Sequence, residues 1–271
     1  MSLPLSAGAG HPVDNKSPTG LSYAYYVTVV LLLAYTLSFV DRQILGLLVQ
    51  PIKADLGLSD WVFSIVHGFA FAIFYTFIGL FLGRVADRWN RRNLILIGVA
   101  VWVLATAAGG YVTGFVSLFI ARMFVGIGEA TLSPAAYSML ADYFPPERRA
   151  RAMSIYTSGV YIGSATAFIV GGLVIQSANQ AGSVDFPLLG SFKPWQAAFI
   201  WVALPGIPLL LLLLTVREPL RRGLRVLQEA SAPVTRAVVP PLQPNLSHVS
   251  GNLPAYAPCL LYTSDAADDK A

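Results

Sequence analysis

The sequence predicts an all-α membrane protein in which six helices cross the bilayer. Of its 271 residues, 55% are hydrophobic and 12% are charged, and the mean hydropathy is +0.62. Soluble domains carry about a quarter charged residues, so this balance is typical of a multispanning membrane protein. The chain also contains six apolar stretches of about 20 residues, the length that a helix needs to cross. They lie at 23–48, 61–83, 94–113, 115–140, 153–176 and 196–216.

Lysine and arginine between these stretches predict their direction, because basic residues concentrate on the cytoplasmic side of a membrane. One side receives Lys16, Arg84, Arg88, Arg91, Arg92, Arg148, Arg149, Arg151, Arg217, Arg221, Arg222 and Arg225, and the other receives Lys53 and Lys193. We therefore expect both ends of the six-helix region to be cytoplasmic, in the inner membrane of a bacterium.

The chain divides into three parts by composition. Residues 1–20 mix Gly, Pro, Ser and Asn without an apolar core, which predicts a disordered cytoplasmic tail and not a signal peptide. Residues 21–222 hold the six spans. Residues 223–271 are Pro-rich and irregular, which is typical of a linker. From Cys259 to Asp268 the sequence resembles the translation of a sequencing-library adapter, so we expect an artificial C-terminus.

Several function classes are excluded by the same composition. The single cysteine, Cys259, excludes an intrachain disulfide and a cysteine-based metal cluster. The net charge of +4 does not indicate nucleic-acid binding, because the arginines cluster at the ends of apolar stretches. No nucleophile–base arrangement, metal cluster or nucleotide loop is recognisable. We therefore expect no enzymatic activity, no metal and no cofactor.

Four charged residues lie inside the apolar stretches and are the candidate transport site. Arg122 and Glu129 are seven residues apart, which is two helical turns, so they share one face of the fourth span. Asp41 and Arg42 lie deep in the first span. Charge within a bilayer costs several kcal/mol, and such residues usually face a wet cavity or a partner. We expect these side chains to converge on one hydrated chamber.

An acid that gains or loses an arginine partner changes its affinity for protons. Our hypothesis makes Asp41 and Glu129 the proton-linked carboxylates. Arg122 is then the alternating partner or the anchor for a substrate anion, and Arg42 supports Asp41 or binds an anionic head group. A static charge network that holds the helices in register is the alternative, because structural networks also perturb titration.

The loop after the second span, from Gly83 to Arg92, reads Gly-Arg-Val-Ala-Asp-Arg-Trp-Asn-Arg-Arg. It resembles the signature loop of the major facilitator superfamily, G-x-x-x-D-R-x-x-R-R/K, which lies between the second and third helices. Asn90 stands where the family often has Gly, and Asn also tolerates a left-handed turn. The resemblance is therefore close in both spacing and position.

This resemblance implies a role for the loop at the cytoplasmic gate. In the family, the Asp and Arg residues of the loop form a latch against the other half of the transporter. Asp87 is then the latch carboxylate, with Arg88, Arg91 and Arg92 around it. Gly83 is expected to allow close helix approach.

The charged spans resemble one branch of this superfamily. Phe39-Val40-Asp41-Arg42-Gln43 in the first span, with the Arg122 and Glu129 pattern in the fourth, is similar to the Spinster branch. That branch contains proton-linked carriers of sphingosine phosphate and lysophospholipids. The anion–cation symporter branch shares the pattern of the fourth span. The resemblance implies the six-helix N-terminal half of the major facilitator fold, two inverted three-helix repeats, whose partner is a missing C-terminal six-helix half.

The function expected from these features is secondary active transport that is proton-linked and works by alternating access. The expected substrate is an amphipathic anion such as a lysolipid or a sphingolipid-like molecule. A small organic-anion or sugar-acid symporter of the same superfamily is the first alternative. A non-transporting membrane receptor or scaffold is the alternative from another class. The expected partners are the bilayer, the anionic substrate, protons and the missing half, with no nucleic acid.

Three local features give further expectations. Gly159, Gly163, Ala167 and Gly171 recur every four residues in the fifth span, which predicts close packing against another helix. The short link around Thr113-Gly114 makes the third and fourth spans antiparallel neighbours. The longer link from Ser177 to Trp195 is expected to carry irregular extracellular structure.

Overall fold

The structure is a computed structural model that describes residues 20–180, 184–186 and 190–221. In this part of the chain six helices or helix pairs are long and apolar enough to cross a membrane, which confirms the predicted number of spans and the all-α class. The spans are Leu21–Leu47, Asp60–Arg88, Arg91–Gly109, Phe115–Tyr143, Pro146–Leu173 and Pro194–Thr215. The expected tail at 1–19 and nearly all of the expected linker, including Cys259, lie outside the described residues, so the three-part division stays a prediction.

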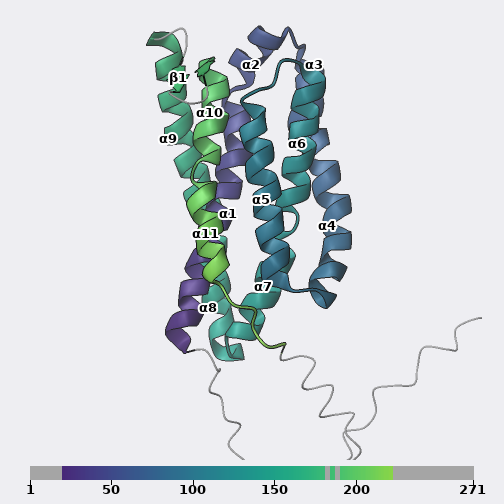
Figure 1. Cartoon of the computed structure of the whole chain (residues 1–271), viewed down its shortest axis with the longest axis vertical. Helices are drawn as coiled ribbons and strands as arrows, with labels where there is room; N and C mark the ends of the chain where they lie inside the picture. The colour runs from purple at the N-terminus through teal and green to yellow at the C-terminus, as the bar shows by residue number, and fades with distance from the viewer. Residues whose placement is uncertain (1–19, 181–183, 187–189, 222–271) are drawn as a thin grey trace, which may run out of the picture. The chain divides into compact units, whose positions relative to one another are not determined.

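Four of the spans in the described part are built from more than one helical element. In order, the elements are α1 (Leu21–Leu47), α2 (Val49–Leu56), α3 (Asp60–Ser64), a π-helical turn (Ile65–Ala70), α4 (Phe71–Arg88), α5 (Arg91–Gly109), α6 (Phe115–Glu129), α7 (Leu132–Tyr143), α8 (Pro146–Thr157), α9 (Gly159–Gln180), β1 (Val184–Phe186), β2 (Gly190–Phe192), α10 (Pro194–Ala203) and α11 (Gly206–Thr215). Figure 1 shows the long columns running side by side.

The sixth span is interrupted at Pro205, between α10 and α11. Proline has no N–H to donate, and its ring clashes with the carbonyl four residues earlier, so it breaks a continuous helix. The amide of Ile207 bonds the carbonyl of Leu204 at 3.1 Å, and the amide of Leu209 bonds that of Pro205 at 3.3 Å. The backbone therefore stays hydrogen-bonded through the break, as a membrane span requires.

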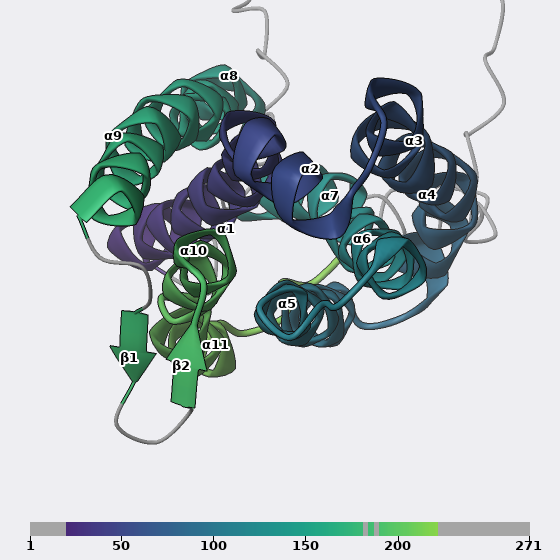
Figure 2. The ribbon, with the colours of Figure 1, turned by 90° about the horizontal axis from the view of Figure 1, so that it is seen from above.

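The third and fourth spans are antiparallel neighbours, as the short link between them predicted. Figure 2 shows α5 directly beside α6, with α4 on the other side of α6. Two glycines set this contact. A Cβ added at Gly98 or at Gly128 would lie 2.6 Å from the carbonyl oxygen of the other, so the backbones touch. Any larger residue at either position would separate the two helices.

The small-residue stripe of the fifth span packs against α1, which confirms that expectation. A Cβ at Gly163 would lie 2.5 Å from the carbonyl oxygen of Thr36 and 2.7 Å from the Cβ of Phe39. A Cβ at Gly171 would lie 2.5 Å from Leu47 Cδ1. The stripe therefore fixes the distance between α9 and the helix that carries Asp41.

The link between the fifth and sixth spans differs from the expectation of irregular structure. Val184–Phe186 and Gly190–Phe192 form a two-stranded antiparallel hairpin in which Val184 pairs with Phe192 and Phe186 with Gly190. Each strand has three residues, which is too short for an alternating pattern to predict it from sequence. Gly190 has a φ of 94°, a conformation that favours glycine.

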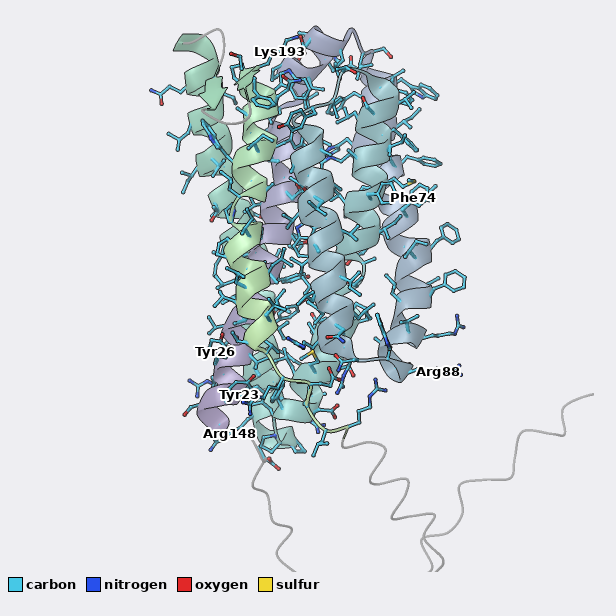
Figure 3. The ribbon with its side chains drawn as sticks, viewed as in Figure 1. Tyr23, Tyr26, Phe74, Arg88, Arg148 and Lys193 are labelled. Atoms are coloured by element: carbon cyan, nitrogen blue, oxygen red, sulfur yellow. The ribbon has the colours of Figure 1, made fainter. Side chains whose placement is uncertain are left out.

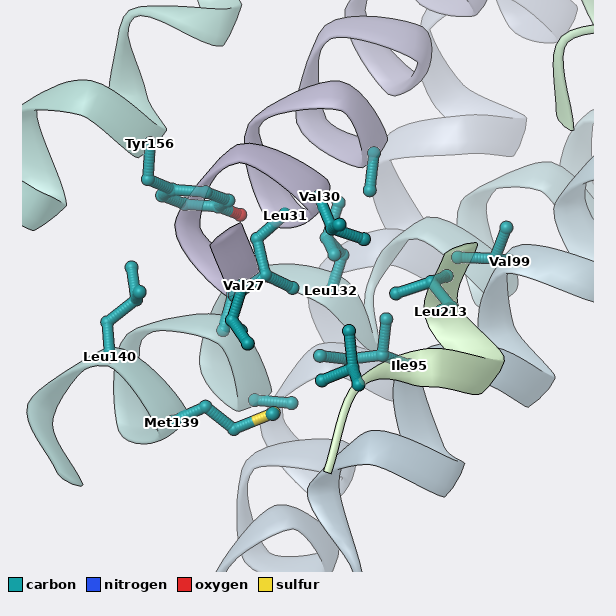
Figure 4. Packing of buried hydrophobic residues seen from close by; sticks show 14 of the residues in the cluster. Val27, Val30, Leu31, Ile95, Val99, Leu132, Met139, Leu140, Tyr156 and Leu213 are labelled. Carbon is teal, nitrogen blue, oxygen red and sulfur yellow. The ribbon is translucent and has the colours of Figure 1, made fainter. Parts of the chain in front are cut away.

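The apolar core fills the space between the columns over the half of the bundle where α1 begins. Figure 4 shows Val27 and Leu31 of α1 meeting Ile95 of α5, Leu132 of α7 and Leu213 of α11. All five side chains are almost fully buried. This packing holds α1 in the centre of the bundle and so fixes the rotation of its polar face.

The two ends of the bundle differ in their charged residues. Figure 3 shows Arg88 and Arg148 at the end where Tyr23 and Tyr26 lie, and Lys193 at the opposite end. At the Lys193 end, Asp55 of α2 forms an ion pair with Lys193. Asp55 also accepts a hydrogen bond from Trp195 Nε1 at 3.1 Å. These contacts fasten α2 to the start of the sixth span.

Candidate transport site

The four charged residues of the first and fourth spans meet in the middle of the bundle. Arg122 Nη1 lies 3.0 Å from Asp41 Oδ2, and Arg42 Nε lies 2.6 Å from Glu129 Oε2. The pairs cross: each acid of one helix is bound by the arginine of the other. Arg42 therefore does not support Asp41, which was one of the roles expected for it, but binds Glu129.

Each carboxylate has a second hydrogen bond from a hydroxyl group. Ser38 Oγ donates to Glu129 Oε2 at 2.8 Å, and Thr106 Oγ1 donates to Asp41 Oδ1 at 2.8 Å. Asp41 and Glu129 are each 1% exposed, so both acids are removed from solvent. Buried charges are tolerated when they are paired and hydrogen-bonded, and this site meets that condition for most of its polar atoms.

Two polar atoms of the site have no hydrogen-bond partner among the described residues. They are Arg122 Nη2 and Glu129 Oε1, and both are buried. An unpaired atom on a buried charged group costs free energy. The site therefore has one donor group and one acceptor atom without a hydrogen-bond partner in the described chain. Both belong to the side chains of α6 that face α1.

Arg42 is additionally enclosed by aromatic rings. Its guanidinium carbon lies 5.1 Å from the ring centre of Phe39, 4.8 Å from that of Phe71 and 4.6 Å from that of Tyr75. Cations are attracted to aromatic ring faces at these distances. The side chain of Arg42 is still 24% exposed, compared with 4% for Arg122, so Arg42 is the accessible cation of the two.

The residues around the four charges could be predicted only in part. Ser38 is one helical turn before Asp41, so its presence on the same face follows from spacing. Thr106, Phe71 and Tyr75 come from α5 and α4, and no spacing rule connects them with α1. Phe71 and Tyr75 are four residues apart, but such apolar spacing occurs throughout every span and is no signal by itself.

The loop motif is divided between a buried and an exposed part. Arg91 is 1% exposed, and its guanidinium binds Glu218 Oε1 at 2.7 Å, Asp142 Oδ2 at 2.5 Å, Ser138 Oγ at 2.8 Å and the carbonyl of Pro219 at 3.2 Å. These partners come from α7 and from the segment after α11. Arg91 therefore ties three distant parts of the chain together at the arginine-rich end.

The other motif residues have different surroundings. The amide of Arg92 bonds Glu218 Oε2 at 2.9 Å, and its Nη2 bonds the carbonyl of Leu214 at 2.6 Å. Asp87 and Arg88 are exposed and form no ion pair or hydrogen bond within the described ranges. The motif thus has an exposed pair, Asp87 and Arg88, and a pair that holds the helices together, Arg91 and Arg92.

Two further residues of the loop have defined local surroundings. A Cβ at Gly83 would meet no atom within 4 Å in the described part of the chain, and the close helix approach expected there stays a prediction. Asn90 does not adopt a left-handed turn: its φ is −70° and its ψ is 112°. Its side chain instead accepts a hydrogen bond from the Asn93 amide at 2.9 Å and caps the start of α5.

Six membrane spans with paired charges buried between the first and fourth define a multi-pass membrane protein of the transporter type. The sequence profile of the Major Facilitator Superfamily matches residues 31–264, and the chain belongs to this family. Its members are transporters and not enzymes.

Three characterised relatives illustrate the similarity. An MFS-type efflux pump of Mycolicibacterium smegmatis is 33% identical over 223 residues, which is 81% of this chain and 48% of the pump. Protein spinster homolog 1 of Xenopus tropicalis is 28% identical, over 84% of this chain and 41% of that protein. The hexuronate transporter of Bacillus subtilis is 30% identical, over 67% of this chain and 39% of that protein.

A solved structure places the chain in the Spinster-like branch. The crystal structure of a bacterial homologue of the human lysosomal transporter Spinster, in an inward-facing and occupied conformation, is similar with a TM-score of 0.68 and 34% identity. The match covers 75% of this chain and 46% of that structure. The chain thus spans less than half the length of each of these relatives, and it corresponds to the N-terminal half of the fold.

Proposed function

We propose that this chain supplies the N-terminal half of a proton-linked secondary transporter that works by alternating access. The observation that carries the proposal is the crossed pairing of Asp41 with Arg122 and of Arg42 with Glu129. Acids and bases at membrane depth are characteristic of ion and proton pathways. A rotation of α1 against α6 would change both pairs at once.

The crossed pairs link proton uptake to such a rotation. An ion pair with arginine needs the charged form of the carboxylate, and protonation removes that charge. Pairing with arginine and binding of a proton therefore exclude one another. Glu129 keeps one oxygen, Oε1, without a partner in the described chain, and this oxygen is the atom at which we place the proton. Protonated Glu129 would release Arg42, which then binds the anionic group of the substrate.

The substrate that we propose is an amphipathic anion such as a lysolipid. The partly exposed guanidinium of Arg42 supplies the positive charge. Phe39, Phe71 and Tyr75 supply apolar surface next to it. The Spinster-related names among the similar proteins support a carrier of this kind.

The test compares transport by the full-length transporter that contains this chain with transport by Glu129→Gln and Asp41→Asn variants in proteoliposomes. Glutamine and asparagine keep the shape of the acids but do not ionise, so we expect at least a tenfold loss of proton-driven lysolipid flux. Asp60→Asn is the control, because the Asp60 side chain is 89% exposed outside the cluster. Full proton dependence in both variants would reject the coupling role, and no flux in the unmodified protein would favour a receptor or scaffold.

A sugar-acid or other small organic-anion symporter is the second candidate. It is supported by the similarity to the hexuronate transporter. The arginine and glutamate of α6 also resemble the pattern of the anion–cation symporter branch. Both substrates carry an anion for Arg42, so the cluster alone suits either. Direct binding of lysophosphatidate and of glucuronate to the full-length protein distinguishes the two.

We also propose that the arginine-rich end faces the cytoplasm of a bacterium. The support is the excess of basic residues at the end where Arg88 and Arg148 lie (Figure 3). Cysteines introduced at Arg148 and at Lys193 test this orientation by their labelling with a membrane-impermeant reagent in whole cells. Labelling of the Arg148 position alone would reverse the assignment.

A further inference from the structure

A cluster of four tyrosines lies beside the charged site, and only one of them, Tyr75, has a part in the proposed transport mechanism. Tyr35 of α1 stacks on Tyr156 of α8 with ring centres 4.5 Å apart and planes at 18°, and Tyr137 of α7 meets Tyr156 edge-on at 5.3 Å. Tyr75 of α4 joins the cluster to the charged site, because Arg42 lies over its ring. Ser133 of α7 lies close to Tyr35 and Tyr156. We call Tyr35, Tyr75, Tyr137, Tyr156 and Ser133 the tyrosine cluster.

The cluster lies toward the arginine-rich end from the ion pairs. Tyr35 precedes Asp41 by six residues in α1, which is about 9 Å along the helix axis. Tyr137 follows Glu129 by eight residues, or about 12 Å, in the same direction because the fourth span runs antiparallel to the first. Tyr75, whose ring lies under Arg42, is therefore the near edge of the tyrosine cluster, and the other tyrosines lie further toward the arginine-rich end.

One hydroxyl of this cluster is buried without a partner. Tyr156 is 0% exposed, and its Oη has no partner at hydrogen-bond geometry within the described part of the chain, with Ser133 as a polar neighbour beside it. Figure 4 shows this hydroxyl directed toward α1. A buried tyrosine usually finds a partner for its O–H, and leaving it unpaired costs free energy. Tyr137 is 37% exposed, and Tyr35 and Tyr75 are half-buried, so the cluster is open at one side.

The chemistry of the cluster indicates what it can recognise. Stacking and edge contacts occupy much of the surface of the Tyr35 and Tyr156 rings, and Arg42 covers one face of Tyr75, so the rings do not form an empty cage for a cation. The groups that remain are hydroxyls, each able to donate and to accept a hydrogen bond. Such groups suit an uncharged ligand group that can also donate and accept hydrogen bonds, and a ligand hydroxyl is such a group.

We infer that the tyrosine cluster is a subsite for the hydroxyl-bearing part of the transported anion. Arg42 takes the anionic group, and the hydroxyls of the tyrosine cluster, including those of Tyr137 and Tyr156, take a ligand hydroxyl further toward the arginine-rich end. This inference rests on the proposed function. Two substrate classes carry an anion next to hydroxyls, namely glycerol-based lysolipids and sugar acids, and the experiment separates them.

The experiment measures equilibrium binding of two ligand pairs to the full-length transporter in lipid nanodiscs. One pair is lysophosphatidate and its 2-deoxy analogue, and the other is glucuronate and its 2-deoxy analogue. We expect the hydroxylated member of the substrate pair to bind about tenfold more tightly, the size of one well-formed hydrogen bond. In Tyr156→Phe and Tyr137→Phe the ratio should fall toward one, because the rings remain and only the hydroxyls are lost.

Tyr111→Phe is the matched control, because Tyr111 is exposed at the far end of α5 and does not contact the cluster. Its affinity ratio should equal that of the unmodified protein. A fall of the affinity ratio toward one in Tyr156→Phe and Tyr137→Phe supports the subsite. The ligand pair that shows this fall identifies the substrate class, lysolipid or sugar acid. Binding without hydroxyl preference, or with a preference unchanged by Tyr156→Phe and Tyr137→Phe, overturns the subsite and leaves the transport proposal standing. Binding of neither pair overturns both.

Discussion

At the scale of single residues, the structure gives similar side chains very different environments. Arg91 and Arg88 belong to the same loop motif and are three positions apart. Arg91 is 1% exposed and binds two carboxylates, whereas Arg88 is exposed without an ion pair in the described chain. The motif therefore combines a buried residue that links three parts of this half with residues that are exposed.

This difference gives the first prediction at the residue scale. Arg91→Ala should lower the free energy of unfolding by about 3–5 kcal/mol, because it leaves Asp142 and Glu218 without their shared cation in a partly buried site. Arg88→Ala, the matched control, should change stability by less than about 1 kcal/mol. Denaturation of the purified chain in detergent measures both. Equal losses would show that the Arg91 contacts do not stabilise the fold.

The second residue-scale prediction concerns the shape of the Arg42 side chain. Arg42→Lys keeps the charge but loses the planar group that lies over Phe39, Phe71 and Tyr75 and bonds Glu129 through Nε. We expect at least a tenfold loss of substrate affinity in the full-length transporter, measured by equilibrium binding. Thr106→Ser, which keeps the hydroxyl that bonds Asp41, is the control and should bind normally. Wild-type affinity in Arg42→Lys would mean that only the charge matters.

At the scale of elements, glycine contacts determine how closely the helices approach. The backbones of α5 and α6 touch at Gly98 and Gly128, and α9 meets α1 at Gly163. Close backbone approach is a common way of packing helices in membranes, where lipid tails compete for every apolar side chain. These contacts fix how closely α5 approaches α6 and how closely α9 approaches α1, and α6 and α1 are the two helices that carry the crossed ion pairs.

Substitutions along α9 test this packing. Gly163→Ala should destabilise the bundle by about 1–3 kcal/mol, because the new Cβ would lie 2.5 Å from the carbonyl oxygen of Thr36. Gly172→Ala should be neutral or slightly stabilising, because nothing lies within 4 Å of its Cβ in the described chain and alanine favours helix. Thermal unfolding in detergent compares the two. A neutral Gly163→Ala would show that α1 and α9 can separate without cost.

At the scale of the whole molecule, this half presents a loop motif whose exposed residues Asp87 and Arg88 form no ion pair in the described part. Asp87 is exposed at the end of α4 and forms no ion pair there. In the full-length transporter we expect Asp87 to bind the other half when the cytoplasmic gate is closed. The structural stability of this half should therefore not depend on Asp87, whereas the balance between the inward-facing and outward-facing states should.

Asp87→Asn provides the test. We expect this variant to shift the full-length transporter toward the inward-facing state, because the neutral side chain weakens the latch. The measurement is the labelling rate of cysteines placed at the cytoplasmic gate, which should rise several-fold while the melting temperature stays constant. Asp60→Asn, at the other end of the bundle, is the control. An unchanged labelling rate would rule out a latch role for Asp87.

Much of the architecture could be predicted because it depends on local properties of the chain. Length and hydropathy define each span, and the spacing of Gly159, Gly163 and Gly171 defines a face that packs closely. The hairpin between the fifth and sixth spans was not predictable, because three-residue strands have no measurable period. The capping of α5 by Asn90 was also not predicted, because family spacing does not determine which neighbours fold against a loop.

The sequence by itself determined that six helices cross the membrane, that Arg122 and Glu129 share one face, and that Asp41 and Arg42 lie at membrane depth. These facts follow from helical geometry and from the cost of charge in lipid. Only the tertiary structure decided that Arg42 binds Glu129 and that Arg122 binds Asp41. The choice of partner depends on the rotation and height of one helix relative to another, and these are set by packing contacts distributed over the whole bundle.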